Sequence, residues 1–357
     1  IEKNHRTIEE KRSNIDYDLD GLVYKVDDLN LQKRLGFISN SPRWAIAHKF
    51  SSEKGFSKIK NIEIQVGRTG ALTPVAKIDP INVGGVVVSN ATLHNEDEIE
   101  RKDIRVNDTV CIQRAGDVIP QVLYADKSKR DKNIRKFIFP TKCLCGKQTL
   151  KEFNDTTKKI DAVRRCPDIG YECRYMAKEK LKHLVSKDAF NIEGLGRKVI
   201  ENFWNLNLIK YPSDIFNLNY KKINHLEGWG IQSASNLKNA IQASKNISLA
   251  RFIFSIGIRH IGQENAKVLA KYFVSLNKFE NLFNRIKRKS DLENLKSVNG
   301  IGETQTKSIN HFFSSDKNLT VIKNLIQNLN VQDHIVLKTK GVLSGRHLMF
   351  TGGLKKI

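Results

Sequence analysis

Residues 226–237, LEGWGIQSASNL, place a tryptophan between two glycines and continue at once into a helix-like pattern. Three other stretches repeat the order of an apolar residue, any residue, glycine, an apolar residue and glycine. They are residues 192–196, 258–262 and 298–302, and the copy at 258–262 has His260 in place of the first glycine. The final glycines of successive copies lie 34, 32 and 40 residues apart. A period of this size indicates stacked supersecondary units.

Each unit is expected to hold a short helix, a glycine hairpin and a second helix. Glycine permits a positive φ and a close approach by another chain. The middle apolar residue, Trp229 in the second copy, is expected to fill the core between the helices. Unpaired amides at the start of the second helix then face outward, and with the helix dipole they form a site for a phosphate. The glycines expected to contact a nucleic-acid backbone are Gly194, Gly196, Gly228, Gly230, Gly262, Gly300 and Gly302.

A single pair of glycines before a helix is more often an ordinary turn. A dinucleotide-binding loop is a second alternative, but no copy has the third glycine or a preceding buried strand. Four copies in a basic region instead resemble the helix-hairpin-helix fold, which grips duplex DNA across its minor groove. Because of His260, the phosphate contact of the third copy is the least secure of the four.

The charge of the chain favours a polyanionic partner. There are 61 Lys and Arg residues against 38 Asp and Glu, a net charge of +23 spread along 357 residues. The charge has two interpretations: a solvated lysine-rich surface without a specific partner, or a surface that binds nucleic acid. No apolar run approaches the ~20 residues needed to cross a bilayer. No signal-peptide pattern opens the chain either, and we expect a cytoplasmic protein without a membrane partner.

Four of the five cysteines fall close together in the sequence. Cys143 and Cys145 form one pair, and Cys166 and Cys173 form a second pair twenty residues later. Four thiolates suit tetrahedral Zn²⁺ in a structural site, although the first pair is one residue shorter than the usual C-x-x-C. Free thiols and an iron–sulfur cluster are the alternatives. Cys111, in the apolar run TVCIQ, is expected to be a buried strand residue.

The front of the chain reads as strands that carry charges. Residues 16–28 alternate polar and apolar side chains and so predict a strand, with Asp20 and Lys25 on either side of its start. A second strand-like run, residues 41–50, ends near Lys49. Such charges would suit a nucleotide phosphate if they project into one cleft. Solvated strand faces are the alternative.

Longer strings make a family resemblance specific. DGLVYK at 20–25 and WAIAHKF at 44–50 are similar to motifs IV and V of the covalent nucleotidyltransferases. The fuller sequence resembles the bacterial NAD-dependent DNA ligases. Residues 61–122 look like their OB-fold domain, and LSGRHLMFTGGL at 343–354 looks like the start of a BRCT domain. The cysteines and the glycine hairpins follow in that family's order, so the resemblance covers essentially the whole chain.

The resemblance implies roles for particular residues. Arg12 matches the arginine upstream of motif IV, and Asp20 matches the motif IV acid. Lys25 and Lys49 match the lysines that contact the adenylate, and Arg68 matches an OB-domain arginine that engages DNA near the nick. The implied reaction uses NAD and Mg²⁺ (or Mn²⁺). A lysine takes AMP from NAD, AMP passes to the 5′-phosphate of a nick, and the 3′-hydroxyl displaces it.

The family's nucleophilic lysine lies in a K-x-D-G motif upstream of motif IV, and no such string occurs in this sequence. We therefore expect a ligase chain truncated at both ends that does not adenylate itself. The expected fold is multidomain α+β with a partial nucleotidyltransferase sheet, an OB-fold β-barrel, a four-cysteine zinc finger and an all-α tandem helix-hairpin-helix domain. The expected boundaries are 1–51 for the adenylation domain, 52–139 for the OB-fold, 140–174 for the zinc finger, 175–328 for the helical domain and 329–357 for the linker and the start of BRCT.

The predicted function is NAD-dependent sealing of nicks in duplex DNA during replication and the repair of DNA damage, by a monomer associated with the bacterial nucleoid. A non-catalytic, structure-specific DNA-binding protein is the main alternative, which the missing nucleophile favours and the motif context of Lys25 and Lys49 disfavours. An RNA-binding OB protein is the third alternative. It is less favoured because helix-hairpin-helix arrays suit duplex DNA.

Overall fold

The computed structural model describes residues 2–11, 14–17, 19–38, 41–51, 53–115, 119–154 and 158–335. The chain divides into two compact units. The first unit contains residues 1–184, 196–218 and 315–321, and the second contains residues 185–195, 219–314 and 322–357. The predicted BRCT start at 343–354 lies outside the described residues.

The first unit opens with a small α/β segment. Its elements are α1 (Glu2–Glu10), β1 (Gly21–Lys25), α2 (Leu29–Leu35), β2 (Phe37–Ile38), β3 (Ser41–Pro42) and β4 (Ala45–Lys49). β1 pairs antiparallel with β4, with Gly21 opposite Lys49. A Cβ at Gly21 would lie 2.5 Å from the carbonyl oxygen of His48, so only glycine allows the two strands to approach this closely. The strand predicted across 41–50 is divided by a turn at residues 43–44.

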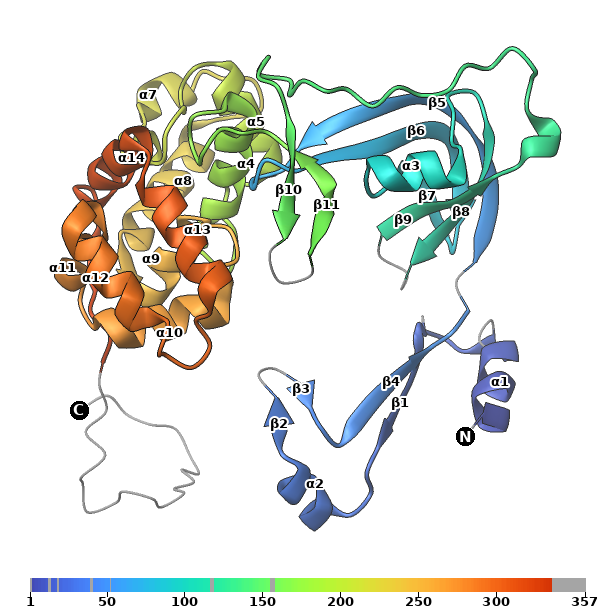
Figure 1. The fold of residues 1–357 in the computed structure, drawn as a ribbon, viewed down its shortest axis with the longest axis horizontal. Helices are drawn as coiled ribbons and strands as arrows, with labels where there is room; N and C mark the ends of the chain where they lie inside the picture. The colour runs from blue at the N-terminus through green and yellow to red at the C-terminus, as the bar shows by residue number, and fades with distance from the viewer. Residues whose placement is uncertain are drawn as a thin grey trace. The chain divides into compact units, whose positions relative to one another are not determined.

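A five-stranded barrel follows, as the sequence predicted. Its strands are β5 (Lys54–Val66), β6 (Leu72–Val83), β7 (Val86–Thr92), β8 (Thr109–Ala115) and β9 (Ile119–Ala125). They close in the order β5-β6-β7-β9-β8, and α3 (Glu96–Lys102) lies between β7 and β8 along the chain (Figure 1). This is the Greek-key arrangement of an OB fold. Fully buried Ile59, Val110, Ile112 and Val122 belong to its core.

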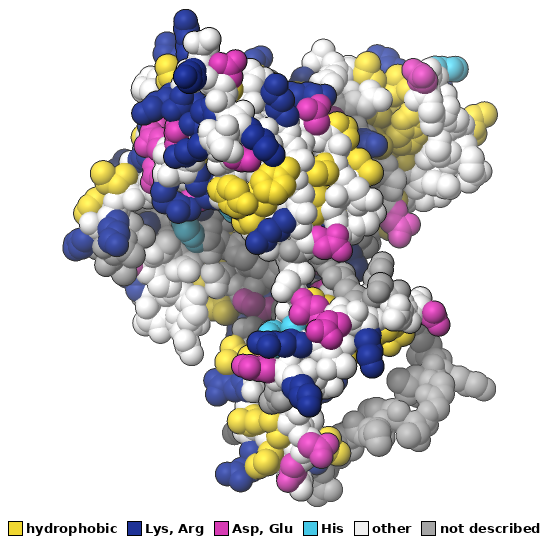
Figure 2. Space-filling model, turned by 90° about the vertical axis from the view of Figure 1, so that its right-hand side faces the viewer, with side chains coloured by type: hydrophobic (Ala, Val, Ile, Leu, Met, Phe, Trp, Pro, Cys, Tyr) yellow, Lys and Arg dark blue, Asp and Glu magenta, His cyan; other side chains and the backbone are white. Residues whose placement is uncertain are grey.

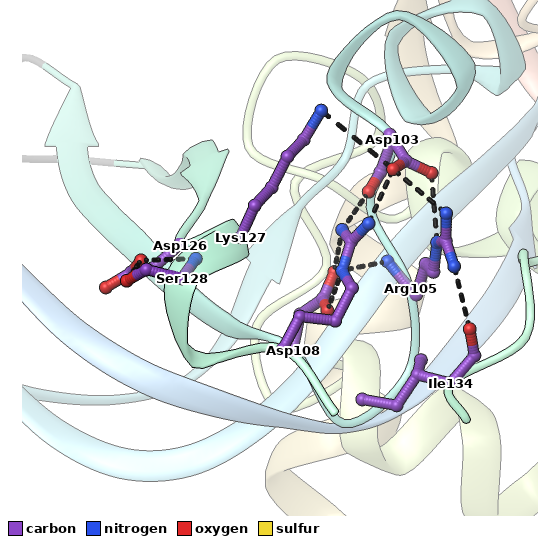
Figure 3. Close-up of polar contacts among 8 residues, drawn as sticks. Asp103, Arg105, Asp108, Asp126, Lys127, Ser128 and Ile134 are labelled. Carbon is purple, nitrogen blue, oxygen red and sulfur yellow. Dashed lines mark hydrogen bonds and ion pairs between the residues drawn. The ribbon is translucent and has the colours of Figure 1, made fainter. Parts of the chain in front are cut away.

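A network of charges holds the segment after β9 against the barrel (Figure 3). Arg130, just after the short helix η2 (Lys127–Lys129), donates to Asp108 and Asp103. Arg105 donates to Asp103 and to the carbonyl oxygen of Ile134. Asp108 is fully buried, so its charge depends on these donors for compensation. No feature of the sequence analysis indicated this network.

The cysteine region packs as an extension of the barrel. It contains the antiparallel pair β10 (Leu150–Asn154) and β11 (Lys159–Arg165). The amide of Cys166 donates to the carbonyl oxygen of Gly70 in the β5–β6 turn, at 2.9 Å. Cys143, Cys166 and Cys173 belong to the same buried cluster as the barrel interior. One hydrophobic core therefore serves both modules.

The remaining part of the first unit is helical. It contains α4 (Arg174–Leu184), α5 (Arg197–Asn205) and α6 (Pro212–Ile215), together with the beginning of α14 (Asp316–Ile326). Asn318 of α14 is fully buried and accepts a hydrogen bond from the Tyr171 amide at 2.9 Å.

The second unit is nearly all α-helical. Its elements are α7 (Tyr220–Ile223), α8 (Ile231–Ser244), β12 (Asn246–Ser248), α9 (Leu249–Ser255), α10 (Gln263–Phe273), α11 (Leu276–Phe279), η3 (Glu280–Phe283), α12 (Arg285–Leu295), α13 (Glu303–Phe313), the rest of α14 and β13 (Asn330–Gln332). Phe279 lies at the centre of the core, with edge-on contacts to Phe252, Phe273 and Phe313. Among the helices of the described ranges, none is both long and apolar enough to span a bilayer.

Candidate nucleic-acid interface and metal centre

All four glycine hairpins adopt the predicted backbone conformation. The first glycine position has a positive φ in every copy, with values of 79° at Gly194, 77° at Gly228, 61° at His260 and 94° at Gly300. The third copy therefore keeps the hairpin geometry without a glycine at the first position. A non-glycine residue costs ~1–2 kcal/mol in this left-handed region, so the geometry is imposed by the surrounding fold.

The middle residue of the hairpin is buried in three copies. Leu195, Ile261 and Ile301 are each at most 3% exposed. Trp229 is only half-buried, so its prediction as a core residue is correct in part. The helix before this hairpin is also short, since α7 has four residues against seven in α9 and eleven in α12.

The second glycine of each hairpin is the N-cap of the following helix. Gly196, Gly230, Gly262 and Gly302 begin α5, α8, α10 and α13 without a side-chain cap. Their φ values are negative, and a Cβ at the first three would meet nothing within 4 Å. Neither backbone strain nor internal crowding requires glycine at these exposed positions. The helix starts thus present amides at a surface that another molecule can approach closely.

The charges at these helix starts differ between the copies. α5 begins with exposed Arg197 and Lys198, which favour an anion. α10 and α13 instead carry Glu264 and Glu303 in the first turn, ion-paired with lysines one turn later. α8 begins with Ile231, which is 80% exposed. The first hairpin is therefore the best anion site electrostatically.

The four clustered cysteines meet in space as predicted. The sulfurs of Cys143, Cys145, Cys166 and Cys173 all lie within 4.8 Å of one another. Tetrahedral Zn²⁺ with Zn–S bonds of ~2.3 Å requires sulfurs ~3.8 Å apart, and Cys145 Sγ lies 3.6 Å from Cys166 Sγ. The short first pair closes through a turn in which Gly146, at φ 95°, donates its amide to the Cys143 carbonyl. The donor set and its spacing fit a zinc ion.

A charged pair that the sequence analysis missed joins the two cysteine pairs. Lys147 forms an ion pair with Asp168, whose side chain is 5% exposed. Asp168 Oδ2 lies 3.9 Å from Cys145 Sγ. The hydrogen bond with Asp168 raises the pKa of Lys147. The sequence could have indicated this pair, because Lys147 and Asp168 each lie two positions after a cysteine, in Cys145-Gly-Lys and Cys166-Pro-Asp.

Two of the predicted nucleotide-handling residues lie together. Lys49 Nζ is 3.4 Å from Asp20 Oδ2, and both side chains are more than half exposed. Lys25 lies at the opposite end of β1, opposite Ala45, and the strand alternation places it on the same face as Lys49. Arg12 lies outside the described residues.

Arg68 lies in the turn between β5 and β6 and is half-buried. Burial lowers its pKa, and its Nη1 has no hydrogen-bond partner among the described residues. Lys180 of α4 is 2% exposed, and burial together with repulsion from Arg68 lowers its pKa to about 7. Two cationic side chains thus share one partly buried site next to the cysteine region.

Known proteins match the chain along nearly all of its length. Residues 1–53 match the NAD-dependent DNA ligase adenylation domain, residues 56–134 match the OB-fold domain of the same ligases, and residues 251–322 match a helix-hairpin-helix motif. A protein named DNA ligase from Pelagibacter ubique is 57% identical over 355 residues, which are 99% of this chain and 52% of the relative. DNA ligases of Parvibaculum lavamentivorans and Xanthobacter autotrophicus are 47% and 44% identical over 99% of this chain and 51% of their own length. The chain spans about half the length of these relatives, and it belongs to the NAD-dependent DNA ligase family.

Proposed function

We propose that this chain holds nicked duplex DNA for an NAD-dependent ligase that joins a 5′-phosphate to a 3′-hydroxyl. The observation that carries the proposal is the repetition of one hairpin geometry, with outward amides, in four copies of a basic chain. Backbone amides and helix dipoles contact phosphates without reading bases. Such a grip suits an enzyme that acts at nicks in any sequence.

The front segment would take part in handling the adenylate. Lys25 and Lys49, at the ends of β1 and β4, would contact the adenylate phosphate, and Asp20, which precedes β1, would pair with Lys49. Arg12 would belong to the same group by its match to the family motif. NAD supplies the adenylate, and Mg²⁺ or Mn²⁺ would offset charge on the transferring phosphoryl oxygens. Fixed cationic side chains stabilise the same charge without reorganising.

The cysteine cluster would hold structural Zn²⁺, and the supporting observation is that its four sulfurs lie within 4.8 Å of one another. Burial raises the pKa of Cys173 to about 11, so binding of a metal must displace that thiol proton. Since the cysteines belong to the barrel core, the bound metal would fix the position of the β5–β6 turn that carries Arg68. Arg68 would engage DNA from that turn.

The proposed domain boundaries are 1–51, 52–139, 140–174, 175–328 and 329–357, the last containing the start of a BRCT domain. The proposed setting is replication and the repair of DNA damage by a monomer at the bacterial nucleoid, in the cytoplasm. The support for this setting is the family of the relatives, which are named DNA ligases.

A pair of glycine variants tests the DNA grip. Gly196→Ala and Gly230→Ala add a methyl group into open space, so we expect unchanged thermal stability. If the amides meet phosphates, the added methyl obstructs the approach and weakens binding to a fluorescent nicked duplex about tenfold. Gly85→Ala, in the open β6–β7 turn of the barrel, controls for lost stability, because its methyl group meets no atom but strains the backbone at a φ of 75°. It should lower the thermal stability and leave the affinity for the nicked duplex unchanged. Unchanged affinity of both hairpin variants would contradict the hairpin grip.

Sealing of a pre-adenylated nicked duplex with Mg²⁺ tests the chemistry. Product formation that falls in Lys25→Ala and Lys49→Ala supports the assigned roles. Binding without any sealing would limit the chain to the DNA-holding role and favour the non-catalytic alternative. Tighter binding to structured RNA than to duplex DNA would overturn the proposal.

A further inference from the structure

Three side chains form a row across the outside of the barrel. Phe56 of β5 is paired with Cys111 of β8, and Cys111 is paired with Tyr124 of β9. Val110 and Ile112, on either side of Cys111, belong to the barrel core, so Cys111 faces outward. We call Phe56, Cys111 and Tyr124 the aromatic platform.

The platform has exposed rings on a rigid base. Phe56 is 50% exposed and Tyr124 is 49% exposed, whereas Cys111 beneath them is 1% exposed. The rings meet edge to face, with centroids 6.3 Å apart. Contact with the Cys111 thiol raises the pKa of the Tyr124 hydroxyl. About half of each aromatic side chain therefore faces solvent.

Lysines surround the platform. Lys54 and Lys58 flank Phe56 on the same face of β5, ~13 Å apart along the strand. Both are exposed, and neither forms an ion pair with a carboxylate in the described part of the chain. Lys129 of η2 lies 5.7 Å from the Phe56 ring centroid.

Acidic residues do little to offset this charge. Asp126, beside Tyr124 in the sequence, accepts from Ser128 and pairs with Lys129. Figure 2, seen from the side on which β8 and β9 lie in Figure 1, shows hydrophobic side chains bordered by many Lys and Arg side chains and by several Asp and Glu side chains. The surface combines stacking surfaces with positive charge.

We propose that the aromatic platform stacks an unpaired base of a single-stranded polynucleotide, while Lys54, Lys58 and Lys129 contact the neighbouring phosphates. Aromatic rings interleaved with lysines are the chemistry that binds single strands without regard to sequence. A purely apolar partner would make no use of the charges of Lys54 and Lys58, which have no carboxylate partner among the described residues. OB folds usually bind oligonucleotides on the face of their second and third strands, whereas this platform spans the first, fourth and fifth strands. The site adds to duplex binding by the hairpins and does not depend on it.

The probe is a fluorescent ten-nucleotide oligodeoxythymidine, titrated with the full chain. Stacking on an aromatic side chain contributes ~1–3 kcal/mol per base. We therefore expect Phe56→Ala and Tyr124→Ala each to weaken binding at least about fivefold. Tyr124→Phe keeps the ring and should bind within twofold of the parent. The control Phe153→Ala removes an aromatic side chain of similar exposure, 56%, from β10, and it should also bind within twofold of the parent.

Further probes distinguish binding by base stacking from binding by charge alone. The parent should bind an abasic oligonucleotide of the same length more weakly than oligodeoxythymidine, whereas the double variant Phe56→Ala/Tyr124→Ala should bind the two probes equally. Equal binding of both probes by the parent would overturn the proposal, and so would equal losses in Phe153→Ala and Phe56→Ala. Oligouridine distinguishes an RNA strand from a DNA strand. Phe56→Leu and Tyr124→Leu preserve side-chain bulk and repeat the test if an alanine variant fails to fold, and nicked-duplex binding should be unchanged in all of them.

Discussion

The buried Asp108 carboxylate accepts two hydrogen bonds from the Arg130 guanidinium, from Nε and from Nη2, each at 2.8 Å (Figure 3). Removing one partner leaves the other charge buried without compensation. We expect Arg130→Met to lower the free energy of unfolding by ~3–5 kcal/mol, measured by urea denaturation. Arg101→Met, at an exposed ion pair on α3, is the control and should change it little. Equal effects would mean that the Asp108–Arg130 pair does not stabilise the barrel.

Asp103 should make the barrel sensitive to acid. The hydrogen bond from Arg105 is the main cause that lowers the pKa of this carboxyl to about 2, and Arg130 adds to it. Because this pKa is lower in the folded state, the charged carboxyl stabilises the fold at pH values above its unfolded pKa of ~3.9. That stability should be lost as the pH falls from about 4 towards 2.

The variant Asp103→Asn checks this pH dependence. Asparagine tolerates the φ of 50° at this position, so the backbone should be retained. Urea midpoints at pH 5 and pH 2.5 should differ less in the variant than in the parent. Identical pH slopes would exclude Asp103 as the titrating group.

Gly228 and Gly230 should respond differently to the same substitution. Neither Cβ would meet a neighbouring atom, but Gly228 has a φ of 77° and Gly230 a φ of −152°. Gly228→Ala should destabilise the second unit by ~1–2 kcal/mol, and Gly230→Ala should leave its stability nearly unchanged. Thermal denaturation compares the two. A loss of stability in Gly230→Ala would show that internal packing requires this glycine.

Gly21→Ala should separate β1 from β4. The new methyl group would lie 2.5 Å from the His48 carbonyl oxygen and 2.7 Å from the Lys49 Cα, both backbone atoms. Amide hydrogen exchange in β1 should therefore accelerate strongly, and the Asp20–Lys49 contact should be lost. Gly36→Ala is the control, because it adds backbone strain at a φ of 66° without any collision. Unchanged exchange in Gly21→Ala would refute the close approach.

Lys147 should help to retain the proposed zinc ion. Its ammonium compensates Asp168, which otherwise places another negative charge beside the Cys145 thiolate. We expect Lys147→Ala to release Zn²⁺ to a chromophoric chelator about tenfold faster, as partners outside the ligand set commonly affect metal affinity. Lys147→Arg should restore retention. Equal release rates in all three proteins would mean that this pair has no role in metal binding.

The periodic parts of the sequence predicted the most. Glycine hairpins are local features, so their spacing alone located all four and indicated the positive φ. The two cysteine pairs likewise predicted that all four thiols meet at one point, and the structure brings them together. Cys111 was correctly expected to be buried in a strand.

What the sequence did not predict depends on contacts between distant segments. Nothing near Asp108 indicates that Arg130 will reach it. The half-exposure of Trp229 was not indicated either, because the local pattern is the same as in the copies whose middle residue is buried. His260 takes a left-handed conformation because its neighbours impose it, although its residue type disfavours it.

The hydrogen bond from Cys166 to Gly70 and the shared core have a consequence for inheritance. Modules that recombine freely between genes meet through small polar surfaces. Here the barrel and the cysteine region divide one interior between them. A foreign cysteine module would leave the barrel core without its contacts to Cys143 and Cys166, so exchange of either part alone should destabilise both. The two modules should pass between lineages together.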